Sequence, residues 1–363
     1  MKPSAALLAA CTCLIVTACA HSSQTAPALH IGGRVAEFDR VVSEAPTPLY
    51  THQWPGVYFE TQFTGPSLSL HFEDAHNRYK LYIDDEAPRL IETPGNIPFE
   101  IKGLPNKPHT ARLEKISESQ SDQGSFYGFT PAHGQGTATA PRARQIEFIG
   151  DSFTVGYGNT SETQTCTESE VWKTTDTSQA FGPMTARAFN ADYQINAFSG
   201  RGIVRNYDSF DGPTLPELYP YALFDGKTLY TDPDWQPQII VIGLGTNDFS
   251  TPIKSGDKWA STDALHTDYR RGYVAFVKEL RQRHPNAFFL LMSSDRFDGT
   301  LRDNVRQVAA TLQADGETRL DTLFFDGLDY GGCHFHPSLA DHQKIKTLLT
   351  GYITAHPDLW QNR

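Results

Sequence analysis

The spacing of apolar residues changes near residue 144 of this 363-residue chain, and this change constrains the fold more than any other feature. From residue 29 to 141, apolar and polar residues alternate in short runs that are separated by turn pairs such as Pro55-Gly56 and Gly65-Pro66. Alternation with a period of two is typical of strands that bury one face. The pattern predicts a β-sandwich over residues 29–141.

A second pattern covers residues 142–363. Five short apolar runs alternate there with segments in which apolar residues recur every three or four positions. Such runs are typical of strands covered on both faces, and the spacing between them indicates helices. We therefore expect a three-layer α/β/α domain with a parallel sheet, whose active site lies at the carboxyl ends of the strands. The five runs are Ile146–Ile149, Tyr193–Ala197, Ile239–Ile242, Phe288–Met292 and Leu323–Phe325.

Residues 1–18 have the anatomy of an export signal, because Lys2 precedes an apolar stretch that is too short to span a bilayer. The stretch ends in Val16-Thr17-Ala18-Cys19, which resembles the bacterial lipoprotein box, where the cysteine is lipidated. An ordinary signal, cut just after this cysteine, is the alternative. Residues 19–28 are predicted to form a tether. We expect an exported protein, lipid-anchored to the bacterial cell envelope at the outer membrane or cell surface, or periplasmic or secreted without the lipid.

The cysteine count leads to a predicted disulfide. Removal of residues 1–18 takes away Cys11 and Cys13, and lipidation uses Cys19, so that Cys166 and Cys333 remain of the five. In an oxidising exported compartment, two remaining cysteines favour one disulfide, with two separate thiols as the alternative.

The charge pattern excludes one class of partner. The chain has 31 Lys and Arg against 42 Asp and Glu, a formal net charge of −11, and no basic run. Nucleic-acid binding needs a basic patch, so we expect none. Beyond the N-terminus no apolar run approaches the roughly 20 residues of a membrane span, so membrane contact is expected through the lipid alone.

Polar motifs directly follow the first three apolar runs. They contain Gly150-Asp151-Ser152, Phe198-Ser199-Gly200 and Thr246-Asn247. A serine that opens a helix can act as a nucleophile, and a backbone N–H or an asparagine amide can donate to the oxyanion that forms. Taken singly, each motif is explained equally well by a helix cap or a turn.

The fifth run leads to a segment that contains Cys333, His334 and His336. A neutral imidazole, with an unperturbed pKa of about 6.5, can take the proton of a serine hydroxyl, so the rate should fall below that pH. Zinc on these three residues, with Asp341 and His342 beyond them, is the alternative, but zinc usually takes four ligands and no second cluster is present. We therefore expect no metal and no cofactor.

In this order, the four blocks resemble the SGNH (GDSL-like) hydrolase superfamily over residues 145–355. The resemblance implies that Ser152 is the catalytic nucleophile and His336 the general base. It also implies an oxyanion hole formed by the backbone N–H groups of Ser152 and Gly200 and by the side chain of Asn247.

The chain departs from this superfamily at one position. The superfamily usually has an aspartate three residues before its histidine, and Cys333 stands there. His334 and Asp329 are candidates to orient the His336 ring instead. We expect a Ser152–His336 dyad in which a backbone carbonyl or a weakly acidic group holds the imidazole, with part of the electrostatic help of a carboxylate lost.

A narrower resemblance is to carbohydrate esterase family 2, which joins a jelly-roll β-sandwich to an SGNH domain. The stretches Thr174–Gly182, Ser199–Tyr207 and Gly332-Cys333 carry it. It implies removal of acetyl groups from polysaccharides such as xylan and glucomannan. Aromatic side chains can present flat faces to a sugar, and we predict that Phe335 and Tyr207 bind the substrate.

The same catalytic groups would serve other functions. A lipase, a thioesterase or an acetylesterase of bacterial envelope glycans shares them, and the fold does not choose among these. A surface lipoprotein that only binds polysaccharide would not need a nucleophile, an oxyanion donor and a base together. We expect a monomer whose partner is an acetylated polysaccharide or oligosaccharide.

Overall fold

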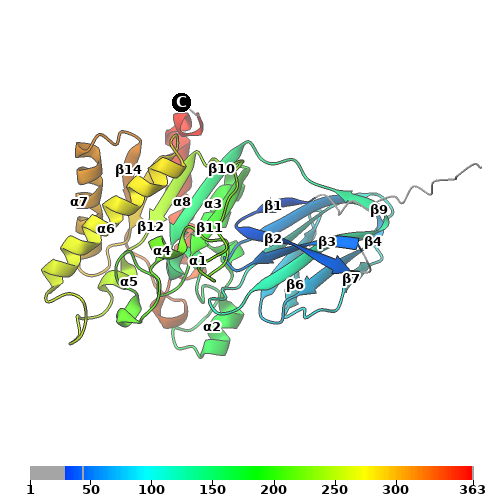
Figure 1. Ribbon diagram of the computed structural model, residues 1–363, viewed down its shortest axis with the longest axis horizontal. Helices are drawn as coiled ribbons and strands as arrows, with labels where there is room; N and C mark the ends of the chain where they lie inside the picture. The colour runs from blue at the N-terminus through cyan, green and yellow to red at the C-terminus, as the bar shows by residue number, and fades with distance from the viewer. Residues whose placement is uncertain (1–28, 43–44, 362–363) are drawn as a thin grey trace, which may run out of the picture.

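The computed structural model describes residues 29–42 and 45–361. It has two parts that meet where the apolar pattern changes, an antiparallel β-domain followed by an α/β domain (Figure 1). The predicted signal peptide, the tether and the lipidation site Cys19 lie outside the described residues. Within the described part of the chain, no helix has the length and apolar character needed to cross a membrane.

The alternating segments of the N-terminal part form strands that pair antiparallel, as the pattern predicted. Their longest path of neighbours runs β2-β3-β9-β4-β8-β5-β6. The strands are β1 His30–Gly32, β2 Val35–Val42, β3 Ala45–His52, β4 Tyr58–Glu73, β5 Arg78–Ile83, β6 Arg89–Glu92, β7 Phe99–Lys102, β8 Pro108–Lys115 and β9 Gly124–Thr137.

Strand β4 changes partners along its length. Its first half pairs with β1 and β8, and its second half pairs with β7; pairing with β9 begins at Gln62 and continues, with shifts in register, to Glu73. Gly65 lies at this change with a φ of 123°, in the region that favours glycine. The change of partners lets the strands surround one apolar core, which includes Phe59, Phe72 and Phe126.

The C-terminal part contains the predicted parallel sheet, in the order β11-β10-β12-β13-β14. All four pairs of neighbouring strands run parallel. Such a sheet has all its carboxyl ends at one edge, which is where the polar motifs were expected to meet. The strands are β10 Arg144–Gly150, β11 Ala191–Ala197, β12 Ile239–Gly243, β13 Phe288–Ser293 and β14 Leu320–Phe324.

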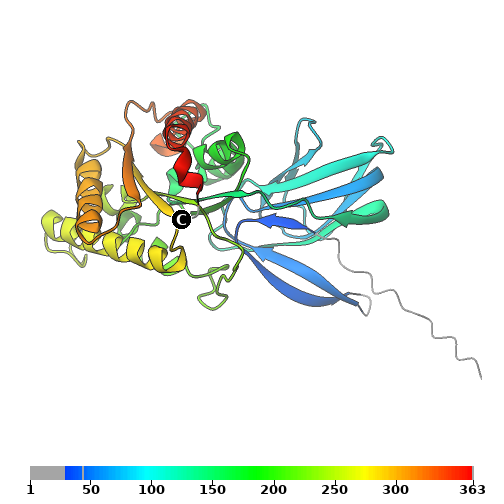
Figure 2. The same cartoon turned by 90° about the horizontal axis from the view of Figure 1, so that it is seen from above.

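Helices cover both faces of this sheet, which confirms the three-layer prediction. On one face, Ile149 and Ile240 belong to a core shared with α6 and α7, and on the other, Phe148 and Val241 pack with α3 and α8. Figure 2 shows the two pairs on opposite sides, α6 and α7 in yellow and orange, α3 and α8 in green and red. The helices of the domain are α1 Ser152–Val155, α2 Glu168–Thr174, α3 Phe181–Ala188, α4 Leu215–Leu218, α5 Thr246–Phe249, α6 Thr262–Arg283, α7 Thr300–Ala314 and α8 Leu339–Ala355.

The two domains share a packed interface. Trp54 of the β-domain lies against Phe198 and Phe224, with ring centroids 5.0 and 4.9 Å apart. The buried carboxylate of Asp192 accepts a hydrogen bond from the Tyr58 hydroxyl at 2.6 Å. Because Phe198 is the first residue after β11, the β-domain packs directly beside one of the strand-end motifs.

Candidate active site

Strand β10 leads straight into the short helix α1, which begins at Ser152. Asp151 is its N-cap, and its carboxylate accepts the Phe153 N–H at 3.1 Å. Burial raises the pKa of Asp151 to about 7. Gly156 ends the helix with a φ of 81°, which glycine adopts without strain. The hydroxyl of Ser152 thus lies at the carboxyl end of a central strand.

His336 lies beside this serine, although 184 residues separate them in sequence. Its Nε2 is 2.8 Å from Ser152 Oγ, and its Nδ1 is 2.9 Å from the Cys333 carbonyl oxygen. A carbonyl only accepts, so we assign the ring proton to Nδ1. Nε2 is then the acceptor of the serine O–H, which is the geometry of a nucleophile and its general base.

Neither side-chain candidate for orienting His336 does so. His334 has a φ of 52°, and its Nε2 donates to the Cys166 carbonyl at 2.8 Å. The Asp329 carboxylate accepts the N–H of Gly331 at 2.7 Å. The His336 ring is held by the backbone of its own loop, because that loop turns the Cys333 carbonyl toward Nδ1.

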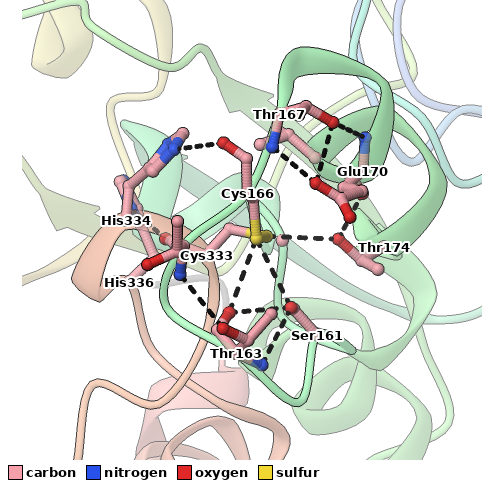
Figure 3. The surroundings of a disulfide bond; sticks show 12 residues. Ser161, Thr163, Cys166, Thr167, Glu170, Thr174, Cys333, His334 and His336 are labelled. Carbon is pink, nitrogen blue, oxygen red and sulfur yellow. Dashed lines mark hydrogen bonds between the residues drawn. A yellow bond between two sulfur atoms is a disulfide. The ribbon is translucent and has the colours of Figure 1, made fainter.

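The predicted disulfide between Cys166 and Cys333 is present (Figure 3). It joins the segment before α2 to the loop that bears His336, and the Cys333 N–H also donates to the Gly158 carbonyl at 3.2 Å. A disulfide sulfur is not a thiolate ligand, so the alternative zinc site lacks its cysteine. Within the residues that the structure describes, no three His, Cys, Asp or Glu side chains gather as a metal site requires.

The surroundings of His336 change its expected titration. Burial lowers its pKa to about 4; the Cys333 carbonyl raises it, and the nearby Arg296 guanidinium lowers it. The ring of Tyr157 lies over the imidazole, with centroids 4.3 Å apart. The unperturbed value of about 6.5 used in the sequence argument is therefore too high. Tyr157 was assigned no role from the sequence, although this residue lies in the block Gly150–Gly158. No sequence motif marks Arg296.

Strand register brings the other two motifs to the same edge. Gly150 at the end of β10 lies opposite Ala197 of β11 and Gly243 of β12. Ser152 and the two motifs that follow β11 and β12 are each within four residues of these paired positions. Parallel pairing thus gathers groups that lie far apart along the chain.

These motifs carry the predicted oxyanion donors. Gly200 has a φ of 79°, which favours glycine. Within the described residues, the backbone N–H groups of Ser152 and Gly200 have no protein acceptor. The Asn247 side chain donates one N–H to the Arg201 carbonyl at 2.9 Å, which leaves its second N–H for a ligand.

Asp248 holds the chain after Gly200 in place. Its buried carboxylate accepts the backbone N–H groups of Ile203, Val204 and Arg205 at 2.9 to 3.0 Å. Burial raises the pKa of Asp248 to about 6, although these three hydrogen bonds favour the charged form. The motif after β12 therefore supports the motif after β11.

Exposed aromatic side chains belong to the segments that carry His336 and Gly200. Phe335 is 57% exposed and directly precedes His336. Tyr207 is 52% exposed and donates its backbone N–H to the Gly200 carbonyl at 2.8 Å. Phe210 is 39% exposed, and the Arg201 guanidinium lies over its ring at 4.8 Å. The two predicted substrate-binding residues are thus exposed, one next to His336 in the chain and one hydrogen-bonded through its backbone to Gly200.

Comparisons with known proteins agree with this geometry. Residues 40–141 match the family described as carbohydrate esterase 2 N-terminal, and residues 148–344 match the GDSL-like lipase/acylhydrolase family. An acetylxylan esterase/glucomannan deacetylase of Cellvibrio japonicus (strain Ueda107) is 46% identical, over 99% of this chain and all of the relative.

Solved structures show the same two-domain arrangement. One is a carbohydrate esterase whose active site is described as displaying divergent catalytic and non-catalytic binding functions. It has a TM-score of 0.87 at 47% identity and covers 92% of this chain and 100% of its own. A family two carbohydrate esterase from Clostridium thermocellum, in complex with cellohexaose, has a TM-score of 0.78 at 27% identity, with the same coverage. The chain is therefore a carbohydrate esterase and belongs to carbohydrate esterase family 2.

Proposed function

We propose that this protein is an exported serine esterase that removes O-acetyl groups from polysaccharides of the acetylxylan and acetylglucomannan type, through an acyl-enzyme. The observation that carries the proposal is the 2.8 Å hydrogen bond between Ser152 Oγ and His336 Nε2. It lies at the strand ends, where backbone and side-chain N–H groups are available for an oxyanion.

In the first half of the reaction, Ser152 Oγ attacks the acetyl carbonyl carbon while its proton passes to His336 Nε2. The carbonyl oxygen becomes an oxyanion, which accepts hydrogen bonds from the Ser152 and Gly200 N–H groups and from Asn247. When this intermediate collapses, the bond to the sugar oxygen breaks, and that oxygen takes the proton from Nε2. The products are a free sugar hydroxyl and acetyl-Ser152.

In the second half, a water molecule attacks the acetyl carbon and gives a proton to His336 Nε2. The bond to Ser152 Oγ breaks, Oγ takes the proton from Nε2, and acetic acid leaves and ionises to acetate in water. The Cys333 carbonyl stabilises the transient imidazolium with a dipole where the superfamily usually has a full negative charge. Ser152 and His336 thus form a working dyad without an acidic third member.

The flanking aromatic side chains favour a sugar substrate. Phe335 and Tyr207 can each offer a flat face to a pyranose ring on either side of the scissile ester. The relative with 46% identity is an acetylxylan esterase/glucomannan deacetylase, which supports the same substrate class here. A lipase, a thioesterase or an envelope-glycan esterase would use the same dyad, so the substrate has to be tested directly.

The proposed location follows from the N-terminal sequence. We propose residues 1–18 as a lipoprotein signal, Cys19 as the lipidated residue and a monomeric enzyme tethered to the cell envelope, with the β-domain at residues 29–141 and the catalytic domain at 142–363. Expression of the full chain in a bacterium tests this through detergent-phase partitioning. The native protein should enter the detergent phase, and a Cys19→Ala variant should not; equal partitioning of both would refute the lipid anchor.

A substrate panel tests the proposed activity. The enzyme is incubated with acetylated xylan, acetylated glucomannan, acetylated peptidoglycan and long-chain nitrophenyl esters, and the released acid is measured. We expect acetate from xylan and glucomannan, and no release by Ser152→Ala. Faster hydrolysis of the long-chain esters would favour a lipase, and wild-type rates in Ser152→Ala would overturn the assignment of the nucleophile.

A further inference from the structure

A segment of the β-domain reaches the motif after β11. It connects β8 to β9 and contains Glu118 and Gln120. The Glu118 carboxylate accepts the backbone N–H of Ser199 at 2.6 Å and the Ser199 hydroxyl at 2.5 Å. The Gln120 side-chain amide donates to the Ser199 carbonyl at 2.8 Å, and its oxygen accepts from Arg201 at 3.1 Å. Four hydrogen bonds thus join this segment to Ser199–Arg201, which we call the oxyanion loop.

The contact with the Ser199 carbonyl bears directly on the proposed oxyanion donor. The Ser199 C=O and the Gly200 N–H belong to one planar peptide unit, so the direction of one determines the direction of the other. A donor on the C=O holds that plane in place. It also polarises the peptide, because hydrogen bonds in a chain strengthen one another, and so makes the N–H a better donor.

The other end of Ser199 is held as well. Glu118 binds the N–H of the preceding peptide unit, so the two units that flank Ser199 are both tied to the β-domain. The Gly200 carbonyl accepts the Tyr207 N–H from the other direction. Gly200 has a positive φ, and glycine is conformationally permissive. The orientation of the N–H groups in this turn therefore depends on contacts with other segments.

We propose that Glu118 and Gln120 are positioning residues that aim the Gly200 N–H into the oxyanion hole, so that the β-domain completes the catalytic site. This inference rests on the proposed function, since it takes Gly200 as an oxyanion donor. Neither residue touches the reacting atoms. Their effect passes through the Ser199–Gly200 peptide, and it should appear in transition-state stabilisation, where charge develops on the oxyanion.

The segment that carries these two residues is itself held by further hydrogen bonds. Gln53 donates to the Gln120 backbone carbonyl at 2.9 Å, and its side-chain oxygen accepts the Phe224 N–H at 2.8 Å. The buried ammonium of Lys115 donates to the Gln53 carbonyl at 2.6 Å and to Ser119 Oγ at 3.0 Å. The positioning segment is thus part of the hydrogen-bonded interface between the domains.

The test uses the full chain and variants of the two residues. Gln120→Ala removes the donor to the Ser199 carbonyl, and we expect kcat to fall about tenfold with KM changed by less than about twofold, a partial loss compared with removal of a whole oxyanion donor. Glu118→Ala should act in the same direction. Glu118→Gln should retain near-normal kcat, because its amide oxygen still accepts the Ser199 N–H and the serine hydroxyl can rotate to bind the amide nitrogen.

A transition-state mimic separates positioning from a structural role. A small alkylboronic acid forms a tetrahedral adduct with a catalytic serine and places a negative oxygen in the oxyanion hole. Its inhibition constant should rise in Gln120→Ala by the same factor by which kcat falls. Ser121→Ala is the matched control, because that side chain belongs to the same segment and contacts Asp122 instead of the oxyanion loop.

The outcomes distinguish this inference from the proposed function. Activity retained by Ser152→Ala would overturn both. An inactive Ser152→Ala with unchanged kcat and boronate inhibition in Gln120→Ala and Glu118→Ala would overturn the positioning role alone. A rise in KM with constant kcat, or a lowered melting temperature with constant kcat, would also overturn it, since either would indicate sugar binding or structural support only.

Discussion

The two sides of Ser152 are held in different ways. On the base side, His336 is oriented by the Cys333 carbonyl, and Cys333 is tied by a disulfide to Cys166 of the same domain. On the oxyanion side, the loop Ser199–Arg201 is held by hydrogen bonds from the β-domain and from Asn247. One side depends on a covalent link within a domain, and the other on polar contacts that include the interface between domains.

This difference shows what each group needs. A base must keep its ring orientation while it gains and loses a proton, and a loop tied by a disulfide to a distant segment of its domain restricts that ring even without a carboxylate. An oxyanion donor must keep the direction of its N–H, and hydrogen bonds along the peptide both fix this direction and strengthen the donor.

The substitution His336→Ala removes the imidazole that we propose as the general base. Without an acceptor for the Ser152 proton, kcat should fall by at least about 10⁴-fold, with the melting temperature close to that of the native protein. Acetate release and differential scanning calorimetry measure the two quantities. A loss smaller than about 100-fold would mean that another group takes the serine proton.

Asn247→Ala perturbs the oxyanion side. Loss of one side-chain donor should lower kcat by about 10²- to 10³-fold, less than loss of the base, because the backbone donors remain. Steady-state kinetics on a small acetyl ester would show the change in kcat with little change in KM. An increase in KM alone would place Asn247 in ground-state binding instead.

Removal of the disulfide tests whether the covalent link helps to hold His336 in place. The double variant Cys166→Ser/Cys333→Ser should lose about 5 kcal/mol of unfolding free energy, since the bridge joins residues 167 positions apart and so closes a long loop. Its kcat should fall about tenfold, because the Cys333 carbonyl no longer holds the imidazole firmly. Denaturant unfolding and kinetics measure these effects.

Reduction of the native protein with dithiothreitol should reproduce the kinetic loss, and the double variant should not respond to the reductant. Full kcat in a protein whose two thiols are shown by mass spectrometry to be free would contradict the proposed role of the bridge.

The smallest expected effect is in the pH profile. Because the pKa of His336 is lowered to about 4, the imidazole stays neutral below its unperturbed value, and kcat/KM should persist below pH 6.5 and fall toward pH 4. The Arg296 guanidinium contributes to this lowering, so Arg296→Gln should move the acid limb to higher pH. An acid limb at the same pH in both proteins would show that Arg296 does not act on the base.

The free energy of unfolding should also depend on the protonation of His336, and the direction of the effect can be worked out. A histidine whose pKa is lower in the folded than in the unfolded state takes up its proton in the unfolded chain first. Protonation of His336 in the unfolded chain therefore lowers the free energy of unfolding as the pH falls from about 6.5 toward 4. Circular dichroism at each pH would separate this loss of stability from the fall in kcat/KM.

Much of the fold and of the site was predictable because it depends on local pattern. Alternation with period two predicted the β-domain, and unbroken apolar runs predicted β10 to β14. The resemblance to the SGNH superfamily, together with the rule that parallel strands end at one edge, then implied that Ser152, Gly200 and Asn247 would lie near His336. The disulfide followed from counting cysteines in a chain expected to be exported.

Other features of the site could not be predicted from local sequence pattern. His334 stands near the base in sequence, yet its positive φ turns its ring toward Cys166. The titration of His336 depends on burial and on Arg296, which is close only in space. Glu118 and Gln120 lie in a polar connection of a different domain, and no motif links them to the oxyanion loop.

The sequence by itself determined the order of elements, the nucleophile and base candidates and the identity of the bridging cysteines, because apolar spacing and residue chemistry are local properties. Only the tertiary structure decided which group orients the imidazole, how far its pKa is lowered and which residues hold the oxyanion loop. These depend on contacts between segments far apart along the chain, and their energies are set by burial and by the direction of hydrogen bonds.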